Sequence, residues 1–202
     1  MSEKVEKQDK GEGYISNAYL RELVVKFNRM NINDTGDWCD AYERKLENKL
    51  TKNTIDTEKY VMSKDFITRK RESINNLQKT YKTFTDEERR KFNAEFEHVK
   101  KDICDAFMKV INGRIISYKL VTSRAYEEID DIRQEALMTL FTYINRYDES
   151  RNSSAFAFVT QLISNAINLY LNNMNERNEK EVTGLDFYEN LNTIDDPYGD
   201  ND

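Results

Sequence analysis

Apolar residues recur every three to four positions along most of this chain, which is the spacing of amphipathic helices. The first such stripe predicts a helix over residues 17–30, with Asn17 as its N-cap. A loop over 31–36 separates it from a short second helix at 38–50. A longer stripe then predicts a third helix over 60–81. The apolar spacing in the N-terminal half is therefore sufficient by itself to indicate a helical protein.

A capping box gives the clearest helix start in the chain, because Thr85 stands three residues before Glu88 and an apolar stripe follows. The stripe predicts a helix that continues through Gly113 toward Leu120, although a glycine inside a helix costs about 1 kcal/mol. Its apolar positions are Phe92, Phe96, Val99, Ile103, Ala106 and Val110.

The next predicted helix, over 128–145, has an apolar side and a side that carries polar groups and carboxylates. The polar side comprises Asp131, Gln134, Glu135, Met138 and Thr142. Arg133 falls on the apolar side, and we interpret it as a long stem that reaches water from the first turns. A polar turn over 146–153 follows, in which Asn152 or Ser153 can cap the next helix.

The helix after this turn is uncharged, because no Asp, Glu, Lys or Arg occurs over 152–175 although 34% of the chain is charged. Winding it at 100° per residue gathers one stripe of mainly amide and hydroxyl side chains, which consists of Ser154, Phe158, Gln161, Asn165, Asn168 and Asn172. The opposite side is apolar and can face a core. Asparagine is a poor residue for the interior of a helix, so these positions lower the helix propensity of the segment. Their presence indicates that the stripe has a function at the protein surface.

Composition narrows the possible classes of protein. The chain has 202 residues, 38% of them hydrophobic, with six glycines and one proline, which favours an elongated all-α protein. The charged N-terminus has no apolar secretion segment and no run of about 18 apolar residues exists, so we expect a cytoplasmic protein without a membrane partner. Two cysteines and one histidine cannot supply a zinc site, and we expect no cofactor.

No catalytic motif is evident in the sequence. The chain has no glycine-rich phosphate loop, no nucleophile elbow, and no serine or cysteine placed beside a base. We therefore expect a protein that binds and does not catalyse.

Charge is concentrated at the C-terminus. Residues 181–202 hold seven acids and no base, whereas residues 1–180 hold 30 acids (37 minus seven) against 31 bases. A near-neutral body with an acidic tail should bind duplex DNA poorly by itself, because nonspecific affinity comes from clustered Lys and Arg. Any nucleic-acid role therefore implies a partner.

The uncharged stripe has chemistry that suits unpaired bases. Amide groups donate and accept hydrogen bonds, and the nearby rings of Tyr143, Tyr147, Phe156 and Phe158 could stack on bases. The alternative is that Phe156 and Phe158 are core residues and the amide stripe is an ordinary solvated face. The side of the 128–145 helix that carries Asp131 also has two interpretations. It is either an ordinary solvated helix face or a surface that docks on basic residues of a partner.

Several segments resemble conserved region two of bacterial RNA polymerase sigma factors. They are Asp131-Ile132-Arg133-Gln134-Glu135-Ala136, Leu140, Tyr147-Asp148-Glu149-Ser150-Arg151, Phe156-Ala157-Phe158 and Asn165-Ala166-Ile167. The match covers residues 92–172. In that family the segment resembling 131–141 docks on the clamp helices of the largest core polymerase subunit. The segment resembling 147–172 recognises and melts the promoter −10 element and captures flipped bases of the nontemplate strand.

The resemblance implies two sets of contact residues. Core RNA polymerase would contact Asp131, Gln134, Glu135, Leu137 and Phe141, with the polymerase flap as a further surface to test. Promoter DNA would contact Tyr147, Phe156, Phe158, Gln161, Asn165 and Asn168. The sequence departs from the family pattern at Arg133, which replaces an aliphatic residue, at Asn152, where glycine is common, and at Gln161-Leu162, which occupy the family's paired tryptophans.

The overall plan resembles the late-gene sigma factors of T-even-type bacteriophages, because only largely polar or acidic residues follow residue 172 and no helix-turn-helix is expected there. Those factors end in a hydrophobic-acidic segment that binds the DNA sliding clamp. Leu185, Phe187 and Tyr188 are similar to it, although an acidic disordered tail with incidental aromatics is the alternative.

The sequence thus predicts an all-α, elongated protein in four parts. Residues 1–31 form a charged segment and a short helix, 32–90 a helical insert of unassigned role, 91–175 a sigma region-2-like domain, and 176–202 a disordered acidic tail. The expected function is a phage-type sigma factor for late-gene promoters. The alternative is an anti-sigma or co-activator protein that binds the polymerase without reading DNA.

Overall fold

The computed structural model describes residues 15–120, 124–150 and 154–192, and describes the side chains of the last helix as far as Arg177. Every regular element in these ranges is helical, which confirms the all-α prediction. The α-helices are α1 (Asn17–Met30), α2 (Asp37–Thr51), α3 (Thr57–Thr83), α4 (Asp86–Ser117), α5 (Ile129–Tyr143) and α6 (Ala155–Asn192). Short 3-10 turns precede and follow α5, at η2 (Arg124–Glu128) and η3 (Ile144–Arg146).

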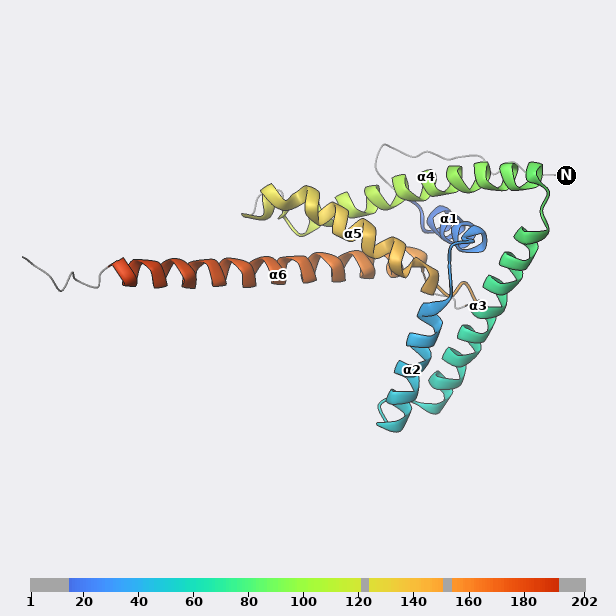
Figure 1. The fold of residues 1–202 in the computed structure, drawn as a ribbon, viewed down its shortest axis with the longest axis horizontal. Helices are drawn as coiled ribbons and strands as arrows, with labels where there is room; N and C mark the ends of the chain where they lie inside the picture. The colour runs from blue at the N-terminus through green and yellow to red at the C-terminus, as the bar shows by residue number, and fades with distance from the viewer. Residues whose placement is uncertain (1–14, 121–123, 151–153, 193–202) are drawn as a thin grey trace, which may run out of the picture.

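The body of the protein is formed by α1, α4, α5 and α6, which bury one shared apolar core (Figure 1). Residues spaced three or four apart on α4 and α5 supply its centre, which contains Phe107, Ile111, Ile132 and Leu140 with almost no exposed surface. Each such side chain contributes about 1.5–3 kcal/mol when it is fully buried. The core therefore fixes α5 and α6 side by side, and it includes α1, so residues 17–30 belong to the body.

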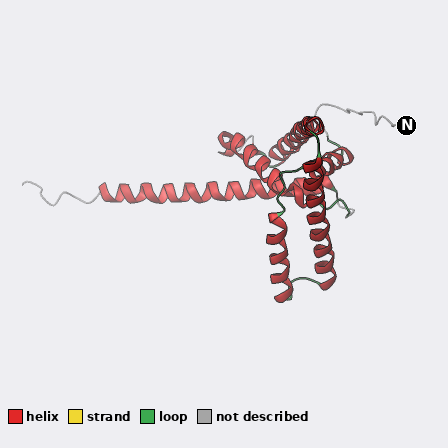
Figure 2. Cartoon of the chain, turned by 45° about the vertical axis from the view of Figure 1, so that its right-hand side comes forward, coloured by secondary structure: helices red, strands yellow, loops and turns green. Residues whose placement is uncertain are grey.

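The insert, 32–90, folds mainly into a hairpin of α2 and α3 that projects from the body in both views (Figures 1 and 2). The hairpin has a small core of its own, formed by Cys39, Leu46 and Ile67 with flanking aromatic rings. Trp38 and Phe66 lie with ring centroids 6.1 Å apart near its base. The insert is therefore a protruding helical hairpin with a small hydrophobic core that is separate from that of the body.

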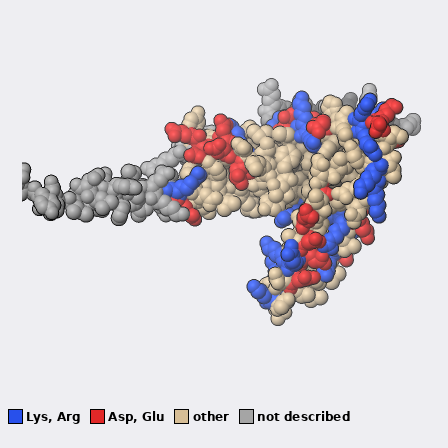
Figure 3. All heavy atoms as spheres, in the orientation of Figure 1, with Lys and Arg blue, Asp and Glu red and all other residues tan. Residues whose placement is uncertain are grey.

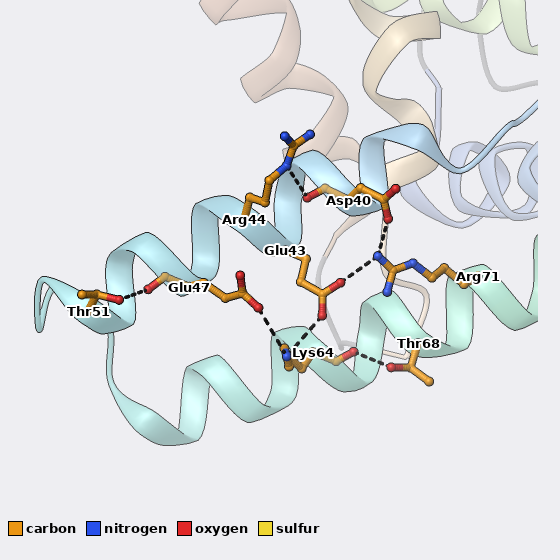
Figure 4. A network of polar contacts seen from close by, with 8 residues as sticks. All are labelled: Asp40, Glu43, Arg44, Glu47, Thr51, Lys64, Thr68 and Arg71. Atoms are coloured by element: carbon orange, nitrogen blue, oxygen red, sulfur yellow. Dashed lines mark hydrogen bonds and ion pairs between the residues drawn. The ribbon is translucent and has the colours of Figure 1, made fainter.

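One side of the hairpin carries a network of ion pairs between its two helices (Figure 4). Arg71 donates to Asp40 and, at 2.7 Å, to Glu43, while the Lys64 ammonium lies 3.2 Å from Glu43 and 3.7 Å from Glu47. The hydrogen bonds from Arg71 and Lys64 hold the pKa of the Glu43 carboxyl below its ordinary value. Exposed pairs contribute only about 0.2–1 kcal/mol each, so the network mainly fixes how the helices are paired.

The last helix is longer than the sequence pattern indicated. The expected tail begins at residue 176, but α6 continues to Asn192, through residues 176–192 of that tail. Its continuation meets no proline before Pro197, and Gly184 alone does not end a helix. Residues 193–202 lie outside the described part of the chain. Among the described helices, none is both long enough and apolar enough to cross a bilayer.

Cys39 offers a test of how firmly the hairpin closes. Its side chain is fully buried, and burial raises the pKa of its thiol from 9.0 to about 11. At pH 8 the reactive thiolate should therefore be about 100-fold scarcer than in an ordinary thiol. We expect Cys39 in a Cys104→Ser variant to react with an aromatic disulfide reagent at least ~100-fold more slowly in the native protein than in guanidinium. Equal rates would mean that the hairpin opens freely.

Candidate nucleic-acid interface

Residues 144–150, which follow α5 and are called the linking segment below, are held by two other elements of the fold. From α1, the Asn28 amide donates to the carbonyl of Ile144 at 3.1 Å and Arg29 pairs with Glu149 at 3.0 Å. From α3 of the hairpin, Arg69 lies 3.8 Å from Asp148. Contacts from both the N-terminal helix and the insert thus fix where α6 begins.

The first turn of α6 is capped by two residues: the Ser154 hydroxyl accepts from the backbone N–H of Ala157 at 3.2 Å, and Asn17 of α1 supplies a second acceptor. The Asn17 side-chain oxygen accepts hydrogen bonds from the Ser154 hydroxyl, at 2.8 Å, and from the backbone N–H of Phe156, at 2.9 Å. We predicted Asn17 as the cap of its own helix, but Ser16 has that role and accepts from the N–H of Tyr19. Asn17 therefore satisfies an amide at the start of α6, where such groups have no partner within the helix. Asn152 and Ser153, the caps expected for α6, lie outside the described residues.

The amide stripe of α6 is exposed along the body. Gln161, Asn165 and Asn168 all face solvent, and the Gln161 amide donates to Asn165 at 2.8 Å, while Ala155, Val159, Ile163, Ala166 and Ile167 are buried on the opposite side. Figure 3 shows a surface without Lys, Arg, Asp or Glu along this part of α6. Leu169 is 57% exposed beside the stripe, and the sequence analysis did not single it out.

The aromatic residues near the stripe are mostly turned inward, which differs from the expectation. Tyr147 is 1% exposed, and its ring lies 5.5 Å from that of Phe158, which is itself half-buried against the core. Tyr147 therefore cannot contact DNA in this conformation, because its ring fills the space between the linking segment and α6. Phe156 is 37% exposed and is the aromatic residue best placed to stack on a base.

The residues predicted on the α5 face divide into two groups. Asp131 and Gln134 are exposed and Glu135 is half-buried, so these three are available to a partner. Leu137 and Phe141 pack on the core instead, and the Phe141 ring lies 5.6 Å from that of Phe107 and 5.7 Å from that of Phe27. Their main role in this structure is therefore to hold α5 in place.

Other exposed groups complete this face. Met138 is 58% exposed next to Gln134, and the sequence analysis placed it on this side without assigning it a contact. Figure 3 shows Asp and Glu gathered at the end of α5 that follows η2. The face thus combines carboxylates with one exposed apolar side chain, a mixture suited to a basic partner surface.

Polar contacts beneath the two surfaces tie α4, α5 and α6 together. Arg133 donates to Asn112 of α4 at 2.9 Å, which explains why an arginine can occupy the apolar side of α5. Arg114 of α4 donates to the buried hydroxyl of Ser164 on α6 at 2.6 Å. The Tyr170 hydroxyl bonds to Glu128, and this hydrogen bond raises the pKa of the tyrosine. The spacing of α5 and α6 is thus set by specific bonds as well as by apolar packing.

In the part of the chain that the structure describes, neither a metal centre nor a clear small-molecule site accompanies these surfaces. Within the described residues, no group of three His, Cys, Asp or Glu is placed to hold a metal ion. A cavity of about 170 Å³ lies between α1, α3 and the linking segment. Its charged lining is balanced between three cations and three acids, which are Arg29, Arg69, Lys70, Asp34, Asp148 and Glu149. This balance gives no preference for a charged ligand.

Comparisons with known proteins supply no relative, because no family model, no curated protein and no solved structure matches the chain. The features of this chain that bear on function are therefore the two surfaces of α5 and α6 and the residues that they expose.

Proposed function

We propose that this chain is a non-catalytic, sigma-type initiation factor. It binds bacterial core RNA polymerase through the exposed face of α5 and holds the nontemplate strand of an AT-rich, −10-like element along α6. One observation supports this proposal most: an acid-bearing face and an uncharged amide stripe lie on adjacent helices that share one core. A partner bound to α5 would therefore hold α6 at a fixed place on the DNA.

The exposed groups of α6 suit the capture of unpaired bases. The amides of Gln161, Asn165 and Asn168 can donate to and accept from base edges, and Phe156 can stack on one base. Stacking contributes about 1–3 kcal/mol per base, whereas extruding a base costs a few kcal/mol. A single stacking residue offsets the cost of extruding about one base, whereas melting opens several base pairs. The polymerase must therefore supply the remaining free energy.

The charge of the chain also indicates that its DNA binding depends on the polymerase. Residues 1–180 carry 30 acids and 31 bases, and residues 181–202 add seven acids. Duplex affinity arises mainly from neutralised phosphates, so the free chain should bind DNA weakly. The polymerase would bring the amide stripe to the promoter and would provide the cationic surface that the chain lacks.

The C-terminal segment carries a further part of the proposal. Residues 185–188 lie in the last turns of α6, and the side chains of Leu185, Phe187 and Tyr188 fall outside the described part of the structure. Their resemblance to a sliding-clamp-binding segment, and the assignment to late-gene promoters, remain predictions. The same is true of a contact with the polymerase flap.

A second function is favoured by the inward orientation of the aromatic residues. With Tyr147 buried and Phe158 half-buried, a protein that occupies the polymerase clamp helices through α5 and never touches DNA also fits the structure. Such a protein would be an anti-sigma or co-activator. The two functions differ in whether α6 approaches the nontemplate strand.

Run-off transcription tests the proposal directly. Purified core RNA polymerase plus this chain, with templates carrying AT-rich −10-like elements, should start at chosen sites, whereas the core enzyme by itself should not. Photoreactive bases placed in the −10 element should label α6 in the same complexes. Transcription without labelling of α6 would favour the co-activator. No specific start on any template, with or without a sliding clamp, would reject the proposal.

A further inference from the structure

The tip of the hairpin carries a lysine-rimmed apolar pocket that the proposed function does not use. Its volume is about 200 Å³, and it lies between α2 and α3. Tyr42, Leu46, Ile55 and Met62 supply its apolar lining, and Lys45, Lys49 and Lys59 stand at its rim. A cavity of about 150 Å³ can hold one benzene ring, so this pocket has room for a single aromatic or aliphatic side chain.

The rim lysines are available to a ligand because they are exposed and the α2 acids of the ion-pair network face the other way. On α2, at 100° per residue, the residues of the ion-pair network and the residues of the pocket lie on roughly opposite sides. Glu43 and Glu47 are engaged with Lys64 in that network (Figure 4). In the part of the chain that the structure describes, no carboxylate pairs with Lys45, Lys49 or Lys59, and all three are exposed.

The pocket is also held away from the body. Lys59 is ten residues before Arg69, the point at which α3 meets the linking segment, and this distance along the helix is about 15 Å. Figure 3 shows Lys and Arg along one edge of the hairpin toward its tip, with Asp and Glu beside them on the same arm. Val61 and Met62, each about half exposed, add apolar surface at the same end. Such an arm can be reached by a partner without blocking α5 or α6.

We propose that the hairpin tip binds a peptide segment of a separate protein. The segment would insert one aromatic or aliphatic side chain into the pocket and place carboxylates against the lysine rim. The apolar lining favours a peptide over nucleic acid, because a phosphate would use the lysines and leave Tyr42, Ile55 and Met62 without a partner. Residues 181–192 of the same molecule are an unsuitable occupant, since α6 leads away from the hairpin in both views (Figures 1 and 2).

Fluorescence anisotropy with the full-length chain tests this inference. The probe is a short labelled peptide with one central phenylalanine flanked on each side by two aspartates. We expect saturable binding that weakens with added salt. It should fall at least ~10-fold, or about 1.4 kcal/mol, in the Lys45→Glu/Lys49→Glu variant, because two attractions become repulsions. A probe with serine in place of phenylalanine, and the exposed-site variant Met62→Ser, should also bind more weakly.

A matched variant separates this site from a general effect of charge. Lys79→Glu/Lys101→Glu changes the net charge equally at exposed positions on α3 and α4, and it should bind the probe as the native chain does. Equal loss in both variants, or no binding by the native chain, would overturn the proposal. So would a DNA duplex that binds the lysine rim when the peptide does not. Self-association that requires both the lysines and residues 181–202 would instead assign the pocket to a second copy.

Discussion

Replacing Asp131 and Gln134 with lysine should abolish binding to core RNA polymerase and, with it, specific transcription. Both side chains are exposed three residues apart on α5, so the substitutions should leave the core intact. If the face docks on a basic surface, each new lysine meets like charge, which costs several kcal/mol at an interface. Affinity should therefore fall more than ~100-fold in a pull-down or in surface plasmon resonance with immobilised core enzyme.

The control for this variant is Glu72→Lys/Asn76→Lys, which makes the same change of net charge on exposed positions of α3. It should bind the polymerase as the native chain does, and circular dichroism should show equal helicity in all three proteins. Retained polymerase binding by the α5 variant would contradict the docking surface. Equal loss in the two variants would point to long-range charge repulsion instead of a contact at α5.

Local signals in the sequence were sufficient to place most helices. The capping box at Thr85 and Glu88 is present as predicted, and the stripe over 17–30 gave the C-terminal end of α1 and its N-cap to within one residue. These predictions succeed because capping and apolar periodicity involve residues a few positions apart, whose geometry any helix repeats. Gly113 lies inside α4 with open space where a Cβ would stand, so it neither ends the helix nor is required by packing.

Contacts between distant segments could not be read in the same way. Asn17 caps α6 from 139 residues away, and Arg133 is satisfied by Asn112 on another helix. Periodicity shows on which side of its helix a residue lies, but the residue that a side chain contacts depends on how the helices pack. The inward position of Tyr147 has the same origin, because it depends on a gap that only the assembled linking segment and α6 create.

The candidate surfaces were therefore predicted only in part. Helical spacing correctly placed Asp131 and Gln134 on the exposed side of α5 and the amides of α6 on an exposed stripe. The two apolar positions carried over from the family resemblance, Leu137 and Phe141, are half-buried and pack on the core, so their contact with the polymerase stays a prediction. A contact list transferred by position cannot distinguish side chains that touch a partner from those that hold the helix in place.

Replacing Asn165 and Asn168 with aspartate should separate DNA capture from polymerase binding. The two substitutions change almost no volume, and both side chains are exposed, so α6 should keep its structure. After Asn165→Asp, the new carboxylate could still accept the hydrogen bond from Gln161, which has a length of 2.8 Å in the native chain. Carboxylates cannot donate to bases and are repelled by phosphates. Strand opening, followed with 2-aminopurine in the promoter, should fall at least ~10-fold, while affinity for the core enzyme stays unchanged.

The same isosteric change at Asn75 and Asn76, both exposed on α3, controls for added negative charge at a distance from the proposed interface. This control should open the promoter as the native chain does. If the α6 variant opens DNA normally, the amide stripe does not hold the strand, and a co-activator that acts only through α5 becomes the better explanation. If opening fails in both variants, the cause is general repulsion of DNA, which a shift to higher salt should partly relieve because salt screens charges beyond about 10 Å.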